Sequence, residues 1–306
     1  MKKYLGIDIG SVSAKFVLID EDENILKSTY LRNHGIIDTI KEGLEEIADG
    51  EIKGVGVTGS GRKFLNVLLG ADIEKTEVLA HTVGTLKYYP KVRTIMDIGG
   101  EDSKLMVIND GVLENFMMNN ICGAGTGSVI DAIASRMGIK VEDVGDIALQ
   151  YKQRLDFPGK CGVFTQSSVV SRLNSGADKS NILMGVVRGL VNNYLTMAKG
   201  INLQPPYIYQ GATAKNKAIV KSLEEQLNHK IVVPEYCDIM GAIGIALMTK
   251  SNGVEKTKFK GFQITNYDFK TQIKTCEDCE NHCELNQIYE NDKLIGSLGS
   301  RCGKYG

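Results

Sequence analysis

The chain has 306 residues, of which 42% are hydrophobic, so it is long enough to bury a large core in one or two domains. Lysine and arginine total 36 against 37 acidic residues, which gives a formal net charge of −1. This balance provides no field that would recruit nucleic acid or an anionic membrane surface, and we expect neither as a partner.

The N-terminal segment indicates a cytoplasmic protein. Lys2 and Lys3 precede Asp8, which interrupts the chain before any apolar run of signal-peptide length develops. No stretch approaches the roughly 20 apolar residues that a membrane span requires. Because disulfides are disfavoured in the cytoplasm, the 7 cysteines call for metal, redox or core explanations.

The first feature along the chain is a repeated hairpin pattern. Residues 8–20, DIGSVSAKFVLID, recur without a gap as residues 97–109, DIGGEDSKLMVIN. Each copy has Asp-Ile-Gly, a small or polar turn, a lysine and a second apolar run. One such copy would mark only an ordinary hairpin turn, but the matched aspartates and lysines favour two phosphate-binding hairpins that face one cleft.

Glycine-rich turns separate the remaining elements. Residues 53–62 predict a strand that enters a glycine-rich loop, followed by a helix from about residue 63. The run at 123–127 leads into a helix that Gly138 ends. Further on we expect helices at 181–199, 214–227 and 240–250, strands at 207–212 and 231–234, and a polar linker at 251–260.

The paired hairpins, the strand, turn and helix after residue 207, and the small-residue helix at 240–250 together resemble the superfamily of sugar kinases, actin and heat-shock chaperone ATPases. The resemblance implies an α/β, two-domain actin-like ATPase fold of duplicated ribonuclease H-like domains. More narrowly, four runs look like the activators of 2-hydroxyacyl-CoA dehydratases and the benzoyl-CoA reductase ATPase subunits. They are DIGGEDSK at 97–104, CGAGTG at 122–127, KCGVF at 160–164 and GATAKNK at 211–217.

This resemblance covers roughly residues 1–250. It places subdomain I at 1–92 with about 238–250, and subdomain II, which carries the nucleotide and cluster motifs, at 93–237. Residues 251–306 would form a linker and a cysteine-rich metal-binding tail. The resemblance also implies a homodimer with one 4Fe-4S cluster at its two-fold axis, and ATP with Mg²⁺ in each subunit.

The implied activity is ATP-driven electron transfer into a client metalloenzyme. The client would be a 2-hydroxyacyl-CoA dehydratase or a double-cubane iron-sulfur protein, and the donor a ferredoxin or a flavodoxin. Two rival interpretations remain open. One is a small-molecule kinase of the same superfamily, and the other is a noncatalytic ATP-binding regulatory protein with a zinc tail.

Phosphoryl chemistry depends mainly on positioning and charge stabilisation. Asp8 and Asp97 are the candidates for holding Mg²⁺ through its water shell, because Mg²⁺ takes one or two carboxylates and keeps several waters. Glu101 or Asp102 would position the attacking water, and one of them could instead merely stabilise the turn. The nucleotide-binding candidates lie in the glycine-rich turns and are Gly10, Ser11, Ser13, Lys15, Gly99, Gly100, Lys104, Gly125, Thr126, Gly127, Gly211, Ala212, Thr213 and Asn216.

Two groups of cysteines are candidate metal ligands. Cys122 and Cys161 supply half of the four thiolates that a 4Fe-4S cluster takes, so two copies in an isologous dimer would complete the set. Cys276, Cys279, Cys283 and Cys302 form a second set within one chain, suited to zinc or a second iron-sulfur cluster. Cys237 lacks partner spacing, and we expect it to be structural.

Overall fold

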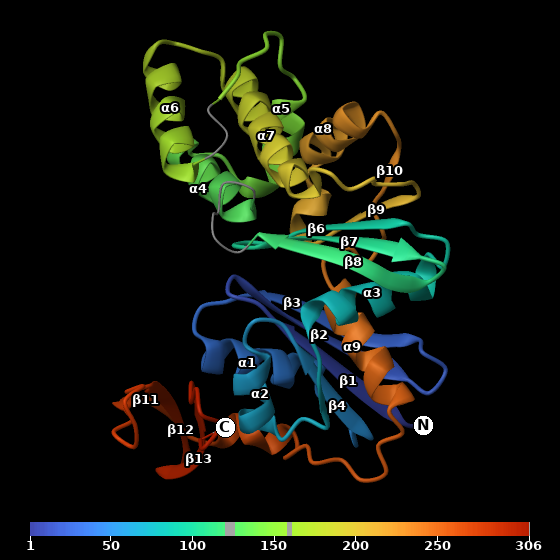
Figure 1. Ribbon diagram of the computed structural model, residues 1–306, viewed down its shortest axis with the longest axis vertical. Helices are drawn as coiled ribbons and strands as arrows, with labels where there is room; N and C mark the ends of the chain where they lie inside the picture. Colours follow the sequence, from blue (N-terminus) through green and yellow to red (C-terminus); the bar gives the residue numbers. More distant parts are fainter. Residues whose placement is uncertain (120–125, 158–160, 306) are drawn as a thin grey trace. The chain divides into compact units, whose positions relative to one another are not determined.

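The computed structural model describes residues 1–119, 126–157 and 161–305, which group into two compact units (Figure 1). The first unit contains Met1–Gly84 and Gly241–Gly306, and the second contains Thr85–Met240. The predicted residues Cys122 and Gly125 lie outside the described residues. No described helix is long and apolar enough to cross a membrane.

The first unit is built on a five-stranded sheet of order β3-β2-β1-β4-β5. The long strands β1 and β2 are buried along almost their whole length because helices cover both faces. The helices are α1 (Ile36–Ile47), α2 (Arg62–Leu69) and α9 (Met240–Ser251), and the strands are β1 (Lys3–Ile9), β2 (Ser13–Asp20), β3 (Ile25–Arg32), β4 (Gly54–Thr58) and β5 (Ile73–Glu74).

Close packing of α9 on this sheet explains its small residues. A Cβ atom at Gly6 of β1 would lie 2.1 Å from the carbonyl oxygen of Ala242. A Cβ atom at Gly244 would lie 1.7 Å from the carbonyl oxygen of Ala80, on α3 (Glu77–Tyr88). Only glycine fits at these two contacts, one on β1 and one on α9, and the second agrees with the predicted small-residue composition of α9.

The second unit repeats the same plan, with a five-stranded sheet of order β10-β9-β6-β7-β8. In both sheets the central strand pairs antiparallel with the next strand and parallel with a later one. The strands are β6 (Thr94–Ile98), β7 (Ser103–Asn109), β8 (Val112–Asn119), β9 (Tyr207–Gln210) and β10 (Ile231–Val232). This duplication confirms the actin-like α/β class.

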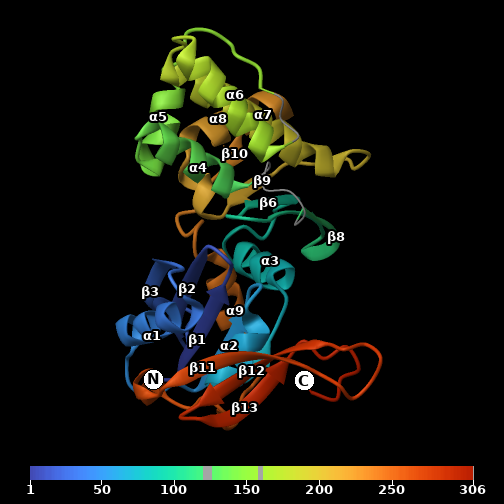
Figure 2. The same ribbon diagram turned by 90° about the vertical axis from the view of Figure 1, so that its left-hand side faces the viewer.

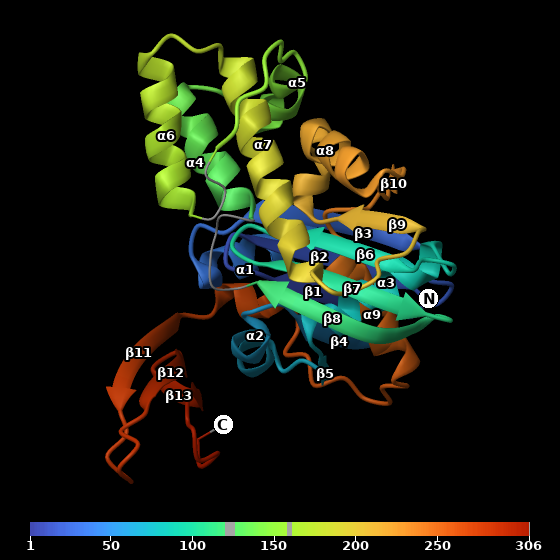
Figure 3. The same ribbon diagram turned by 45° about the horizontal axis from the view of Figure 1, so that its top comes forward.

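A layer of helices covers the second sheet, and Figure 3 shows α4, α6 and α7 side by side. Tyr194 and Tyr209 are completely buried in the core beneath them. The predicted helix at 181–199 begins earlier, at Lys179, where the Asp178 side chain accepts from the backbone N–H of Ser180. The helices are α4 (Gly127–Met137), α5 (Val144–Ala148), α6 (Gly162–Asn174), α7 (Lys179–Leu195) and α8 (Lys217–Leu227).

Residues beyond α9 form a folded part of the first unit. The strands β11 (Phe269–Thr275), β12 (Glu284–Glu290) and β13 (Lys293–Leu298) make a three-stranded antiparallel sheet beside α2 (Figure 2). Phe269 and Ile288 join the core cluster that contains Leu44 and Leu65. The segment predicted as a linker and tail is therefore anchored by apolar packing.

Candidate nucleotide and redox site

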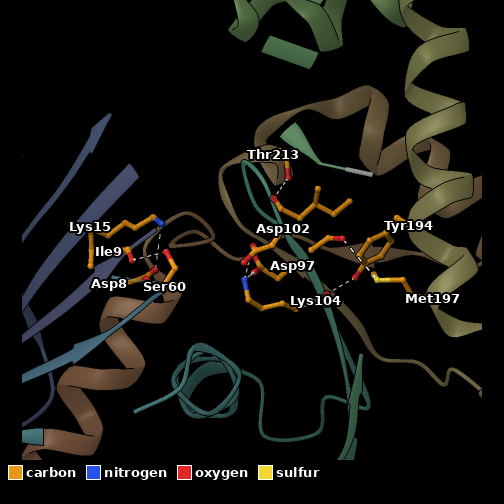
Figure 4. A network of polar contacts seen from close by, with 12 residues as sticks. Asp8, Ile9, Lys15, Ser60, Asp97, Asp102, Lys104, Tyr194, Met197 and Thr213 are labelled. Atoms are coloured by element: carbon orange, nitrogen blue, oxygen red, sulfur yellow. Dashed lines mark hydrogen bonds and ion pairs between the residues drawn. The ribbon is translucent and has the colours of Figure 1, made fainter. Parts of the chain in front are cut away.

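The turn between β6 and β7 gathers three charged side chains (Figure 4). Asp97 and Lys104 are paired residues on the two strands and are 3% and 2% exposed. The Lys104 Nζ atom lies 3.6 Å from Asp97 Oδ2 and 2.8 Å from Asp102 Oδ1. Two carboxylates thus offset the cost of burying the ammonium group, and Lys104 does not extend to solvent as a strand lysine often does.

The same turn is closed by its backbone. The Gly99 N–H donates to the Asp102 carbonyl oxygen over 2.9 Å. A Cβ atom at Gly99 would lie 2.9 Å from Asp102 Oδ1, so a larger residue would push the carboxylate away. Glu101, at the tip of the turn, is exposed. The two water-positioning candidates therefore differ in environment, since Asp102 is ion-paired and Glu101 faces solvent.

The N-terminus of α4 is bonded to this turn. The Gly127 N–H donates to the Gly99 carbonyl oxygen at 2.8 Å, and the Ser128 N–H donates to the Gly100 carbonyl oxygen at 2.9 Å. Thr126 is completely buried at the N-cap position. These bonds fix the start of α4 against the turn, so that a shift of one would be transmitted to the other.

The turn after β9 packs on the end of β6. Gly211 has a φ of +89°, and a Cβ atom there would lie 2.6 Å from Asp97 Oδ1. The Thr213 hydroxyl donates to the Ile98 carbonyl oxygen at 2.6 Å. The exposed Ala212 begins a 3₁₀ turn, Ala212–Lys215, and Asn216 Oδ1 accepts from the first N–H groups of α8. The described nucleotide-binding candidates of the second unit thus lie on the β6–β7 turn, the start of α4 and the turn after β9.

Buried tyrosines support this network from the core. The Tyr194 hydroxyl donates to the Lys104 carbonyl oxygen at 2.7 Å. Burial, reinforced by the negative charge of Asp97, raises the pKa of Tyr194 well above its usual value. Burial likewise raises the pKa of Tyr209, whose hydroxyl lies 2.8 Å from Thr213 Oγ1. Both phenols are therefore neutral hydrogen-bonding groups at physiological pH.

The hairpin of the first unit repeats the same pairing. Lys15 is opposite Asp8, and its Nζ atom lies 3.4 Å from Asp8 Oδ2 (Figure 4). The Gly10 N–H donates to the Ser13 carbonyl oxygen at 2.9 Å, as Gly99 does to Asp102. Ser11 is exposed in the turn and Ser13 is buried at the start of β2. The structure therefore confirms that the repeated sequence forms two similar hairpins, and it adds an aspartate–lysine pair in each.

A second loop supports the end of β1. The Gly61 N–H donates to the Ile9 carbonyl oxygen at 3.1 Å, and Gly59, with a φ of +96°, would place a Cβ atom 2.1 Å from the same oxygen. This loop leads directly into α2. It links α2 to the residue that follows Asp8.

His81 is a candidate functional residue that the sequence motifs did not identify. It is 7% exposed on α3, and its Nε2 atom lies 2.9 Å from the point where a Cβ atom at Gly241 would stand. Asp8 Oδ2 lies 2.8 Å from the same point, so the imidazole and the carboxylate flank one position. A lone histidine in a helix gives no signal that separates such a role from ordinary core packing.

Cys161 occupies the N-cap position of α6 and is half-buried. Its neighbours Val163 and Phe164 are 69% and 67% exposed, an unusual exposure for two large apolar side chains. Cys237 is buried, and burial raises its pKa to about 11, so its thiol is neutral and structural. Within the described ranges, no three His, Cys, Asp or Glu side chains already surround a point that would hold a metal ion.

Comparisons with known proteins identify an ATPase family and related dehydratase activators. Residues 5–249 match the BadF/BadG/BcrA/BcrD ATPase family. The chain is 31% identical over 261 residues to the 2-hydroxyisocaproyl-CoA dehydratase activator of Clostridioides difficile, covering 83% of this chain and 97% of the relative. It is 30% identical over 249 residues to the (R)-2-hydroxyglutaryl-CoA dehydratase activating ATPase of Acidaminococcus fermentans, covering 79% and 95%.

A solved structure is similar over the same region. The activator of the 2-hydroxyisocaproyl-CoA dehydratase from Clostridium difficile with bound ADPNP matches with a TM-score of 0.76 and 30% identity. The match covers 82% of this chain and 95% of that one. The family match ends at residue 249, before the sheet of β11 to β13.

Proposed function

Because the chain belongs to the BadF/BadG/BcrA/BcrD ATPase family, we propose that it is an ATP-hydrolysing activase that delivers low-potential electrons to a partner metalloenzyme. The observation that carries the proposal is the pair of matched hairpins, each with a buried aspartate opposite a lysine. They occur in a chain whose relatives are named activators of 2-hydroxyacyl-CoA dehydratases.

Asp8 and Asp97 are the carboxylates that would hold Mg²⁺ through its water shell. Both are buried at strand ends, 4% and 3% exposed, and each has an ammonium group within 3.6 Å that offsets part of its charge. The backbone N–H groups of the glycine turns and the hydroxyls of Ser11 and Ser13 would contact phosphates.

We assign the positioning of the attacking water to Glu101 and a structural role to Asp102. Asp102 already accepts a hydrogen bond from Lys104 and closes the turn through its carbonyl oxygen. Glu101 is exposed at the same turn and can reorient when ATP binds. Glu101→Gln should therefore lower the rate of hydrolysis more than the affinity for ATP, whereas Asp102→Asn should weaken the fold of the turn.

Cys122 and Cys161 of each protomer would hold the 4Fe-4S cluster in a homodimer. Cys161 fits this role because it is accessible at a helix N-terminus, where the helix dipole favours a thiolate. The exposed Val163 and Phe164 beside it suit burial against a second subunit. The cluster, when bound, would supply the one-electron redox chemistry.

The bonds between α4 and the β6–β7 turn suggest how ATP would act on the cluster. Cys122 stands just before α4 in the chain, and the α4 N-terminus is bonded to the carbonyl oxygens of Gly99 and Gly100. A change at this turn on binding or hydrolysis would move α4 and the adjoining cysteine. The proposed client is a dehydratase or a double-cubane cluster protein, and the donor a ferredoxin or flavodoxin.

The experiment is an anaerobic transfer assay. The purified protein is reduced with dithionite, freed of excess reductant and mixed with a purified 2-hydroxyacyl-CoA dehydratase and its substrate. We expect dehydration that requires MgATP and that Asp97→Asn abolishes. Dehydration independent of ATP would overturn the proposed coupling, and ATP hydrolysis with no transfer would overturn the dehydratase as client.

A further inference from the structure

The sheet of β11 to β13 brings all four C-terminal cysteines to one of its ends. Cys276 directly follows β11, Cys283 directly precedes β12, and Cys279 lies in the connection between them. The start of β12 pairs with the end of β13, with Asn286 opposite Leu298, so Cys302 lies just beyond the same end. Residues distant in sequence are therefore gathered by the antiparallel topology.

Two of the thiols are direct neighbours. The Cys276 N–H donates to the Cys283 carbonyl oxygen at 2.8 Å, which continues the β11–β12 pairing by one residue. Opposed residues of an antiparallel pair project from the same face, with Cβ atoms about 4.5–5.5 Å apart. Both side chains are buried, 8% and 6% exposed, and they pack with Leu285 and Tyr305.

The segment after β13 is fastened to these cysteines. The Arg301 N–H donates to Cys283 Sγ at 3.5 Å, and the Ser300 hydroxyl lies 3.4 Å from Cys302 Sγ. Lys304 forms an ion pair with Asp278, between Cys276 and Cys279. A backbone N–H directed at a sulfur atom stabilises the thiolate form that a metal requires.

We propose that this end of the sheet is a zinc site formed by Cys276, Cys279, Cys283 and Cys302. Four thiolates are a complete ligand set for tetrahedral zinc, with Zn–S distances of about 2.3 Å. The opposed pair Cys276 and Cys283 places two of the four thiols on one face of the sheet, within reach of a single ion. No three of the described ligands yet converge on one point, so zinc binding would bring the segments at 277–282 and 299–302 closer together.

The zinc site would brace the nucleotide-binding unit. Strand β13 packs directly on α2, because a Cβ atom at Gly296 would lie 2.5 Å from Val67 Cγ1. Helix α2 is preceded by the Gly59–Gly61 loop, which is bonded to Ile9, next to Asp8. This site lies outside residues 5–249 and does not depend on the proposed electron transfer.

The test measures zinc and iron in the full-length, anaerobically purified protein, compared with Cys276→Ser/Cys283→Ser and with the matched control Cys237→Ala. We expect about one zinc ion per chain in the wild type and the control, and almost none in the double variant, with iron unchanged in all three. Absence of zinc from the wild type after incubation with zinc would overturn the proposal, as would zinc retained by the double variant. Iron in place of zinc at these cysteines would overturn the assignment of the metal.

A second measurement uses only the wild type, in case the variant fails to fold. Co²⁺ added to the chelator-treated protein should give the thiolate-to-cobalt absorption and the visible bands of a tetrahedral site, and zinc should displace it. Absence of these bands would contradict the site. The core cluster is measured separately by its iron content. Absence of the zinc site would therefore not contradict the proposed function.

Discussion

The Lys104 ammonium group lies 3.6 Å from the Asp97 carboxylate, with both side chains almost completely buried. Asp97 and Lys104 lie on the two strands that flank one turn. The first unit has the same arrangement, with Asp8 opposite Lys15. Each aspartate therefore faces an ammonium group inside a closely packed strand end. Such a carboxylate is positioned before a cation or a nucleotide binds, which is what electrostatic catalysis of phosphoryl transfer requires.

Replacing Asp97 should remove ATP hydrolysis without affecting the cluster. Asp97→Asn keeps the size of the side chain but loses the charge that we propose holds Mg²⁺, and we expect the rate to fall by roughly a hundredfold or more. Glu114→Gln makes the same chemical change at an exposed position on β8 and serves as the control. Phosphate release and iron content are measured on both. Normal turnover of Asp97→Asn would refute the assignment.

His81 should contribute to hydrolysis through Asp8. His81→Ala removes an imidazole that flanks the same point as the Asp8 carboxylate, and we expect the rate to fall about 10–100-fold, as when a partner of a metal-holding group is lost. His34, whose side chain is 54% exposed, supplies the control His34→Ala. Steady-state rates and ATP affinity are compared. Equal rates for both variants would leave His81 as a packing residue.

Cys237 should make the stability of the second unit fall at alkaline pH. Burial raises the pKa of its thiol from 9.0 to about 11, so the folded state keeps a proton that the unfolded state loses. This contribution is fully present below pH 9 and is lost as pH rises toward 11, with a slope of about 1.4 kcal/mol per pH unit. Urea unfolding of wild type and Cys237→Ala from pH 7 to 10.5 measures this contribution to the free energy of unfolding. Parallel pH curves for the two proteins would contradict the buried thiol.

The contact between α3 and α9 should not tolerate a methyl group. Gly244→Ala would place a Cβ atom 1.7 Å from the Ala80 carbonyl oxygen, and we expect a loss of about 1–3 kcal/mol in the free energy of unfolding. Gly10→Ala is the control, because the nearest atom to a Cβ atom there is 3.6 Å away. Denaturant midpoints provide the comparison. A midpoint for Gly244→Ala equal to that of the control would mean that the helices are packed less closely.

Local patterns predicted the hairpins because the aspartate, turn and lysine spacing has a single simple geometry. The repeat predicted two similar hairpins, and the structure adds the register that places Asp8 opposite Lys15 and Asp97 opposite Lys104. Gly138 was likewise confirmed as the end of α4, where it adopts a φ of 63°. In such cases short-range steric rules decide the conformation.

Features set by distant residues were not predictable in the same way. The approach of His81 to the Gly241 position depends on the packing of α3 against α9, which no local pattern encodes. The β11–β13 sheet was missed because most of β11 faces solvent and its apolar anchors are few. The burial of Lys104 depends on Asp102 and on the surrounding core, which the local spacing does not encode.

The claim that this ATPase carries an iron-sulfur cluster is tested most directly by iron and sulfide analysis with EPR spectroscopy. The proteins are wild type, Cys161→Ala and Cys237→Ala, each purified anaerobically. The account predicts about four irons per dimer and a reduced-cluster signal in the wild type and in Cys237→Ala, with both lost in Cys161→Ala. Wild-type protein without iron, even after anaerobic reconstitution, would contradict electron delivery and leave an ATPase of another function.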